Sequence, residues 1–325
     1  MHAWLCETTD GPEALAWKET PTPEPGEGEV RIAVKAASLN FPDILITQGK
    51  YQFKPPLPFV PGAEYAGIVD KVGPGVSHLT PGMPVAAIAG TGGFGTYACV
   101  KAAQVLPLPP GFKLEDAAAF AFTYGTSHHA LIDRGALQPG ETVLVLGAAG
   151  GVGTAAIQIA KAAGARVIAA ASTDEKCETC RALGADATIN YSREKLREAL
   201  AALTGGKGPD LVYDPIGGDL AEQAFRSIAW RGRYLVIGFA AGGIPALPFN
   251  LPLLKGASVV GVFWGDFVKR EPGNSARALA QLSQWYAEGK VKPVIDELLP
   301  ISELPHAYRR MASREVRGKL VMQLD

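Results

Sequence analysis

The chain has 325 residues, enough for about two domains at roughly 150 residues each. Apolar residues make up 47% of the chain and charged residues 19%, a balance that excludes wholesale disorder. The 31 Lys and Arg residues against 32 Asp and Glu give a net charge of −1. This charge argues against binding to nucleic acid or to an anionic membrane surface through a basic patch.

The first 122 residues predict a β-rich unit with few helices. Apolar and other residues alternate over 30–36, which is the period of a half-buried strand. Turn signals such as the Gly-Pro-Gly at 73–75 separate further short strands. These strands are predicted at 67–73, 84–89 and 95–100. We therefore expect an antiparallel, barrel-like unit here.

From about residue 115 the pattern becomes an alternation of helices and strands. One apolar helix is predicted over 115–133, and later helices at 274–288 and 302–313 precede a last strand at 319–324. In between, apolar strands are predicted at 142–146, 166–171, 187–190, 210–214 and 233–238, joined by helices at 153–163, 174–183, 193–203 and 219–229. Continuous apolar strands joined by helices indicate an α/β, doubly wound parallel sheet.

A glycine-rich turn follows the strand at 142–146. The turn is Gly147-Ala148-Ala149-Gly150-Gly151-Val152-Gly153, and it opens the next predicted helix. Glycines allow a tight turn and a close approach to a pyrophosphate, and the helix N-terminus attracts its charge. The alternative is a turn that only packs helix against strand. The strand–turn–helix context favours a dinucleotide site.

The end of the next strand distinguishes NADPH from NADH. An NAD site usually has Asp or Glu there, about 20 residues after the glycines, but this strand ends in Ala170-Ala171-Ser172-Thr173. Ser172 and Lys176 can bind a 2′-phosphate, although Lys176 could also be a solvated surface lysine. Tyr191, after the third strand, could flank the same phosphate or be an ordinary surface residue. We therefore expect NADPH rather than NADH.

The residues around the glycine turn also carry a family resemblance. The stretch GETVLVLGAAGGVGTAAIQIAK (140–161) resembles the zinc-independent quinone oxidoreductases of the medium-chain dehydrogenase/reductase superfamily, the zeta-crystallin-like group. The likeness continues through SLNFPDI (38–44), PFVPGAEYAGIV (58–69) and GTYA (95–98). It implies a GroES-like catalytic domain at 1–122, a Rossmann NADPH-binding domain at 123–265 and a C-terminal return to the catalytic domain at 266–325.

The resemblance also implies site residues and partners. The cofactor contacts that it implies are Asn40, Thr126, Gly150, Gly151, Val152, Gly153, Ser172, Lys176, Tyr191, Phe239, Phe263 and Arg317. Members of the family are commonly homodimers or homotetramers, often paired through a sheet edge such as 258–264. We therefore expect a homo-oligomer with a small-molecule substrate and without nucleic-acid or membrane partners.

We expect no metal in this protein. By resemblance, Asn40 and Ala63 stand where zinc-bearing relatives have Cys and His, and neither supplies a thiolate or imidazole. Cys177 and Cys180 form a CxxC within a predicted helix, which we interpret as free thiols or a redox-sensitive pair.

These features predict hydride transfer from NADPH to a quinone or an α,β-unsaturated carbonyl. The catalytic candidates, by resemblance, are Asn40, Asp43 and Tyr51. Tyr51 or water could donate the proton, and Asp43 could instead cap a helix. Alternatives are an enoyl-thioester reductase and a non-enzymatic, crystallin-like NADPH-binding protein. No secretory signal is visible, and the uncharged stretch between Glu141 and Lys161 is interrupted by glycines, so a cytoplasmic location is expected.

Overall fold

The computed structural model describes residues 1–325, which divide into two units. Unit 1 comprises Met1–Phe122 and Ile295–Asp325, and unit 2 comprises Thr123–Val294. The return to unit 1 thus begins at Ile295, whereas the sequence predicted it at residue 266. Residues 266–294, which we assigned to the return, group with unit 2.

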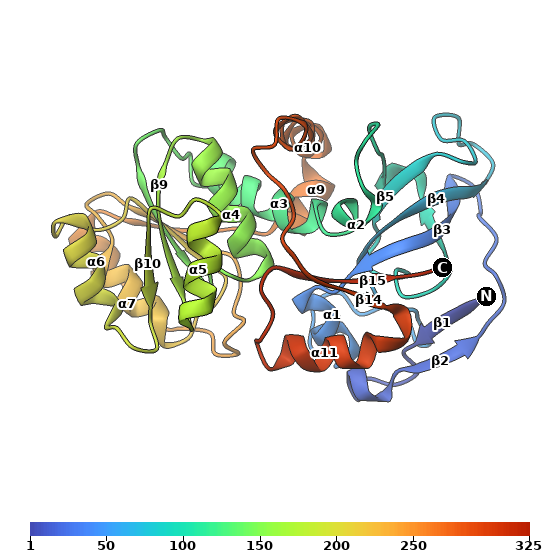
Figure 1. Ribbon diagram of the computed structural model, residues 1–325, viewed down its shortest axis with the longest axis horizontal. Helices are drawn as coiled ribbons and strands as arrows, with labels where there is room; N and C mark the ends of the chain where they lie inside the picture. Colours follow the sequence, from blue (N-terminus) through green and yellow to red (C-terminus); the bar gives the residue numbers. More distant parts are fainter. The chain divides into compact units, whose positions relative to one another are not determined.

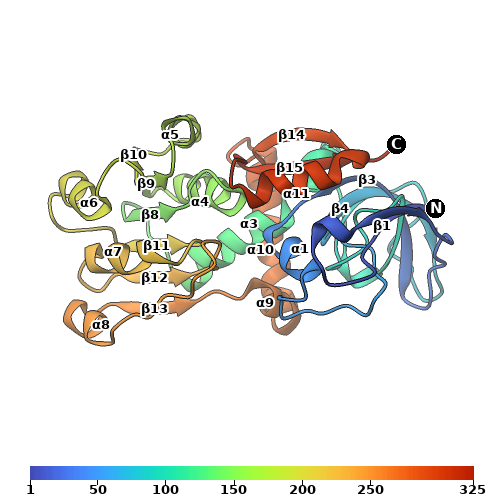
Figure 2. The same cartoon turned by 90° about the horizontal axis from the view of Figure 1, so that it is seen from below.

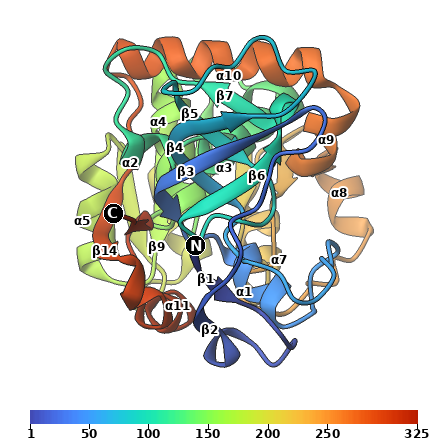
Figure 3. The same ribbon diagram turned by 90° about the vertical axis from the view of Figure 1, so that its right-hand side faces the viewer.

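Unit 1 is built on a seven-stranded, mostly antiparallel sheet. Its order is β14-β15-β3-β4-β5-β7, with β6 also paired to β3. These strands are β3 (Glu29–Ser38), β4 (Glu64–Val72), β5 (Pro84–Ile88), β6 (Tyr97–Lys101), β7 (Val105–Pro107), β14 (Ile295–Pro300) and β15 (Lys319–Gln323). Only β14 and β15 pair in parallel. Figure 3 shows β3 and β4 side by side, with the separate β1 (His2–Leu5) and β2 (Ala16–Glu19) nearby.

Alternating burial along β3 confirms the strand predicted from its apolar period, and the inward residues join the core of unit 1. The close approach of β4 to β3 depends on Gly67, because a Cβ there would lie 2.0 Å from the Ala33 carbonyl oxygen. The short helices of this unit are α1 (Phe41–Thr47), α2 (Leu114–Ala117) and α11 (Leu304–Ala312), with 3₁₀ turns at Pro12–Ala14, Ala102–Gln104 and Ile301–Glu303.

Unit 2 is a doubly wound sheet of six parallel strands, as predicted. The order is β10-β9-β8-β11-β12-β13, and Figure 2 shows these strands stacked in this order. The strands are β8 (Thr142–Leu146), β9 (Arg166–Ala171), β10 (Ala187–Asn190), β11 (Leu211–Asp214), β12 (Arg233–Val236) and β13 (Ser258–Gly261). Nearly every residue of the central strands β8, β9 and β11 is buried, which explains their continuous apolar sequences.

Helices connect these strands, and α4 and α5 lie beside β9 (Figure 1). The helices of this part are α4 (Gly151–Ala162), α5 (Asp174–Ala182), α6 (Leu196–Thr204), α7 (Asp219–Ser227), α8 (Asn250–Lys255), α9 (Trp264–Arg270) and α10 (Pro272–Ala287). No helix in the structure combines the length and apolar character that crossing a membrane requires.

The prediction of a single helix over 115–133 is wrong. The chain forms α2, then α3 (Ala121–His128), then a π-helical turn at His129–Arg134. The carboxylate of Glu64, the first residue of β4, accepts the Phe122 backbone N–H at 2.8 Å. A free N–H group at the start of α3 thus has an acceptor outside the helix. Gly125 lies against the Trp264 ring, where a Cβ would be only 2.7 Å from a ring carbon. Both contacts come from residues distant in sequence.

Candidate active site

The parallel sheet brings the predicted cofactor residues of unit 2 to one edge. Each follows the carboxyl end of a strand: Tyr191 follows β10, Ser172 and Lys176 follow β9, Gly150–Gly153 follow β8, Phe239 follows β12 and Phe263 follows β13. Neighbouring strands are about 4.8 Å apart, so the edge from β10 to β13 is about 24 Å long. An edge of this length, at the carboxyl ends of a doubly wound sheet, is where extended nucleotides bind.

The glycine turn after β8 brings the start of α4 close to the strand end. Gly147 has a φ of 55°, and a Cβ at Gly153 would lie 2.5 Å from the Gly147 carbonyl oxygen. The Gly150 N–H donates to the Gly147 carbonyl at 3.0 Å, which closes the turn. A side chain at Gly153 would therefore push the helix away from the turn. The tight turn lets backbone N–H groups come close to a phosphate.

The N-terminus of α4 has the features of an anion site. Gly150 is its N-cap, and no side chain caps the helix. The first N–H groups of a helix have no intrahelical acceptors, so a bound pyrophosphate would accept from them. Ser127 in α3 donates to the Val152 carbonyl at 2.9 Å, which joins α3 to the start of α4; Thr126 is the preceding residue of α3, and its contact with a cofactor stays a prediction. Thr126 itself is buried.

At the end of β9, Lys176 and Ser172 lie together. The Lys176 Nζ donates to the Ser172 Oγ at 3.5 Å, so both side chains point to the same place. The acidic Asp174 is engaged elsewhere, since it accepts from Asn190 at 2.6 Å and forms an ion pair with Arg193. Asp174 is therefore not available as the ribose-binding carboxylate of an NAD site. The ammonium of Lys176 instead fits a 2′-phosphate.

Tyr191 lies next to this pair because its backbone N–H donates to the Ala171 carbonyl at 3.1 Å. Arg193 is a further cation at this end that sequence reasoning missed, although its position two residues after Tyr191 was a usable signal.

The two cysteines of the CxxC pattern, Cys177 and Cys180, are buried free thiols on α5. Burial raises the pKa of the Cys180 thiol to about 12, which leaves it protonated and unreactive at neutral pH.

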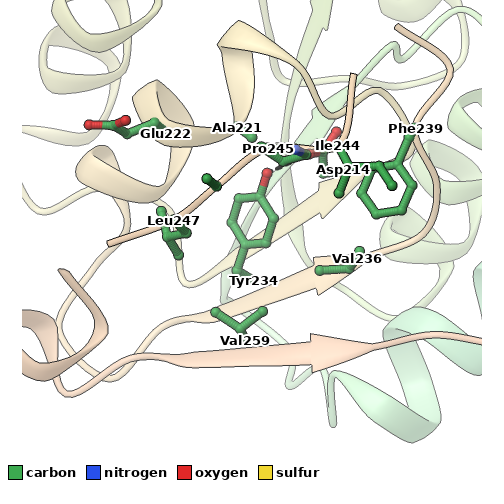
Figure 4. A pocket seen from close by; sticks show the side chains of 11 residues that line it. Asp214, Ala221, Glu222, Tyr234, Val236, Phe239, Ile244, Pro245, Leu247 and Val259 are labelled. Atoms are coloured by element: carbon green, nitrogen blue, oxygen red, sulfur yellow. Dashed lines mark hydrogen bonds between the residues drawn. The ribbon is translucent and has the colours of Figure 1, made fainter. Parts of the chain in front are cut away.

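Phe239 lines a small pocket near the ends of β11 and β12. Figure 4 shows the Tyr234 ring between the labelled side chains of Val236, Leu247 and Val259. At about 150 Å³ the pocket is smaller than the roughly 300–1,000 Å³ of most ligand pockets. It cannot hold a dinucleotide. Phe263, at the end of β13, is more than half exposed.

A buried carboxylate, which sequence reasoning missed, fixes the turn after β11. Asp214 Oδ1 accepts the N–H groups of Ile216 and Gly217 at 2.8 and 2.9 Å, and Oδ2 accepts the Tyr234 hydroxyl. Burial and the adjacent Asp214 raise the pKa of Tyr234, so this phenol stays a donor. Ile216 packs against the Gly147 turn, because a Cβ on Gly147 would be 2.5 Å from the Ile216 side chain. An acid ending an apolar strand was the available signal.

In unit 1, Asn40 and Asp43 are in contact, and Tyr51 is close enough to be affected by the charge of Asp43. Asp43, at the start of α1, accepts the backbone N–H groups of Asn40 at 2.8 Å and of Ala63 at 3.1 Å. The alternative of a helix-capping role for Asp43 is therefore what the structure shows, and a contact with substrate stays a prediction. Burial raises the pKa of Asp43 to about 7, while its hydrogen bonds and Lys319 oppose that rise.

Burial, and secondarily the charge of Asp43, raises the pKa of the Tyr51 phenol. Tyr51 is thus protonated at neutral pH and can donate a hydrogen bond.

Arg317, a predicted cofactor contact, pairs with Asp296 at 3.3 Å, and Arg310 pairs with the same carboxylate at 2.8 Å. A phosphate would have to share Arg317 with Asp296, so its cofactor role stays a prediction.

The side chains of Asn40 and Ala63 do not offer a zinc ion the ligands that it prefers. Ala63 has no donor atom, and the Asn40 Oδ1 accepts a hydrogen bond from the Lys319 ammonium at 2.5 Å. An ammonium at this distance would repel a divalent cation. Nowhere in residues 1–325 do three or more His, Cys, Asp or Glu side chains gather as a metal site would require.

Two protein-family models match successive parts of the chain. The model of the alcohol dehydrogenase GroES-like domain matches residues 26–110, and that of the zinc-binding dehydrogenase matches residues 151–283. Quinone oxidoreductase-like protein 2 of Bos taurus is 39% identical over 325 residues, which covers 99% of this chain and 92% of that protein.

Two solved structures illustrate the fold. A probable oxidoreductase from Mycobacterium abscessus is 39% identical, with a TM-score of 0.91 over 100% of this chain and 99% of that one. The quinone oxidoreductase of Escherichia coli, solved in complex with NADPH, is 30% identical, with a TM-score of 0.92 over 100% of both chains.

The chain therefore belongs to the medium-chain dehydrogenase/reductase superfamily of oxidoreductases, among its quinone oxidoreductase-like members. The family resemblance and the combination of a GroES-like domain with a Rossmann domain are confirmed.

Lys176→Ala tests the cofactor pair at the end of β9. Loss of one charged phosphate contact is expected to raise the KM for NADPH about tenfold, equivalent to ~1.4 kcal/mol, and to leave the KM for NADH unchanged. Steady-state kinetics with both nucleotides measures this. Lys207→Ala, an exposed lysine before β11, is the matched control. An unchanged KM for NADPH would remove Lys176 from the 2′-phosphate site.

Asp43→Asn tests the buried carboxyl of α1. The raised pKa means that folded Asp43 holds a proton between about pH 4 and pH 7 that the unfolded chain releases, so stability falls as pH rises through this window. Relative to Asp43→Asn, which does not titrate, the wild type should lose about 2 kcal/mol of unfolding free energy between pH 5 and pH 8. Urea denaturation at both pH values measures the difference. A gap that is independent of pH contradicts the shift.

Proposed function

We propose that this chain is an NADPH-dependent reductase that transfers a hydride to a quinone or to the β-carbon of an α,β-unsaturated carbonyl, without a catalytic metal. The observation that carries the cofactor assignment is the pairing of Lys176 with Ser172 at the end of β9, while Asp174 is held by Asn190 and Arg193. The NADPH complex of the similar Escherichia coli enzyme supports it.

The chain's own residues have separate tasks in this reaction. Bound NADPH supplies a hydride, and the acceptor gains a pair of electrons and a negative charge on oxygen. Asn40 and the phenol of Tyr51 are the hydrogen-bond donors of unit 1 that would stabilise this charge. Tyr51 or a water molecule then gives the oxygen its proton. The raised pKa of Tyr51 keeps its proton in place until the oxyanion forms.

The acceptor class follows from the donor set. An alcohol substrate needs a Lewis acid or a strong base to release its hydroxyl proton. The groups at Asn40 and Ala63 do not fit a metal, whereas neutral donors suffice for an electron-poor quinone or enone. We also propose the cytoplasm as the site of this activity.

A panel of acceptors tests the function. Quinones, enones and an enoyl-CoA are each offered to the purified protein with NADPH and, separately, with NADH, and absorbance at the nicotinamide band is followed. We expect turnover of quinones or enones with NADPH at least tenfold above that with NADH.

The outcomes separate the alternatives. Turnover confined to enoyl-CoA would identify an enoyl-thioester reductase. NADPH binding, detected by its fluorescence, without turnover of any acceptor would identify a non-enzymatic NADPH-binding protein. Activity that is lost after chelation and restored by zinc would contradict the metal-free mechanism.

We further propose that the chain forms a homodimer through the β13 edge. β13 pairs only with β12, so its other side has unpaired backbone groups. Large apolar side chains are exposed on unit 2 near this edge, including Phe249 at 91% and Leu253 at 78%. A two-fold axis at the edge would pair the strands and cover this surface.

Leu253→Asp tests the dimer. The wild type should sediment at about twice the 34.1 kDa of one chain, and Leu253→Asp, which places a charge in the interface, should sediment as a monomer. Leu298→Asp, an exposed leucine of β14, is the control. A monomeric wild type at micromolar concentration would contradict the proposal.

A further inference from the structure

A buried charge cluster lies in unit 1 where three strands meet. Lys319 is the first residue of β15, Glu64 is the first residue of β4, and Asn40 follows the end of β3. Their exposed fractions are 4%, 0% and 3%, respectively. The strands are neighbours in the sheet, since β3 pairs with both β15 and β4. Charged side chains are rarely this buried unless they have partners.

Asn40 lies between the two charged groups. The Lys319 Nζ donates to the Asn40 Oδ1 at 2.5 Å and lies 3.6 Å from the Glu64 carboxylate. The Asn40 Nδ2 is 3.4 Å from that carboxylate and 3.4 Å from the Ser38 carbonyl oxygen. Glu64 also accepts shorter hydrogen bonds, from the Ser38 hydroxyl at 2.9 Å and the Phe122 N–H at 2.8 Å.

These partners allow only one orientation of the Asn40 amide. An ammonium can only donate, whereas a carboxylate and a carbonyl can only accept. Rotating the amide by half a turn would place its NH₂ against the ammonium and its oxygen against the carboxylate. The ammonium also withdraws electrons from the amide oxygen and makes the N–H groups stronger donors. The present contacts of Nδ2 are long, so a closer acceptor could replace one of them.

The balance of charge makes Lys319 the critical member. The carboxylates of Glu64 and Asp43 both act on its ammonium and oppose the effect of burial, which lowers the pKa of Lys319. Lys319 is the only cation among these contacts. By resemblance, Asn40 and Ala63 occupy the places of the cysteine and histidine ligands in zinc-bearing relatives. In this chain the positive charge beside Asn40 belongs to the Lys319 side chain.

We propose that Lys319 is a positioning residue for the reaction, and that its ammonium holds the Asn40 amide in the orientation from which one N–H can leave its long contact and donate to the acceptor's oxygen. This inference rests on the proposed function, in which Asn40 stabilises the developing negative charge. A purely structural Lys319 would only neutralise Glu64 and join β15 to the sheet.

A double-mutant cycle separates the two roles. Lys319→Met and Asn40→Ala should each lower kcat for the best quinone or enone about tenfold, and the double variant should be no slower than Asn40→Ala alone. Lys319→Arg, which keeps the charge, should retain activity within about threefold. Additive losses in the double variant, or equal losses in Lys319→Met and Lys319→Arg, would contradict positioning through Asn40.

Two further variants control for stability. Lys319→Met leaves Glu64 buried without a cation, so it is also made together with Glu64→Gln, which removes the remaining charge. Lys71→Met removes an exposed lysine that pairs with Glu24 and should leave kcat unchanged. Circular dichroism and urea denaturation verify that each variant is folded.

A readout independent of turnover is the NMR signal of the Asn40 side-chain NH₂, assigned by its loss in Asn40→Ala. We expect two distinct, exchange-protected protons in the wild type and in Lys319→Arg, and broadened or unprotected ones in Lys319→Met. Unchanged protons in Lys319→Met would overturn the proposal. A wild type that reduces no acceptor would refute the proposed function alone, because the NMR signal would still decide the orientation of Asn40.

Discussion

Parallel pairing of the six strands in unit 2 is the constraint on which the candidate cofactor site depends. Because all six carboxyl ends face the same edge, side chains that are far apart in sequence lie along one edge without any long loop. The glycine turn, the Lys176–Ser172 pair and Phe239 take their order along this edge from the strand order. Asp214 links two of these places, since it fixes the turn that packs against Gly147.

Unit 1 follows another rule, in which buried polar groups hold strands and site residues at once. Asp43 accepts the backbone N–H groups of Asn40 and Ala63, which would otherwise be buried without an acceptor. Glu64 accepts from Phe122 and thereby determines where α3 begins. The same carboxylate faces Lys319, so the role that we propose for Asn40 and the packing of the sheet depend on shared groups.

Local sequence patterns were sufficient to predict most of the strands and helices of unit 2. The strand at 142–146, the glycine turn and the helix after it lie within about 20 residues, and their signals reinforce one another. Ser172 and Lys176 are only four residues apart, so their pairing was also predictable. The Lys319–Asn40 contact joins residues 279 positions apart, and no local pattern could indicate it. The helix predicted over 115–133 is interrupted close to Phe122, whose N–H contacts Glu64, 58 positions away, and for the same reason the interruption was not visible.

The sheet of unit 1 is assembled from both ends of the chain, with β15 inserted between β14 and β3. During synthesis on a ribosome, residues 1–122 emerge before unit 2, but the strand that completes their sheet emerges after unit 2. Until then Glu64 has no ammonium beside it and β3 has an open edge, whereas unit 2 has all of its strands by residue 261. Unit 2 can therefore fold before the sheet of unit 1 is complete, and the open sheet of unit 1 is exposed to aggregation and to chaperones in that period.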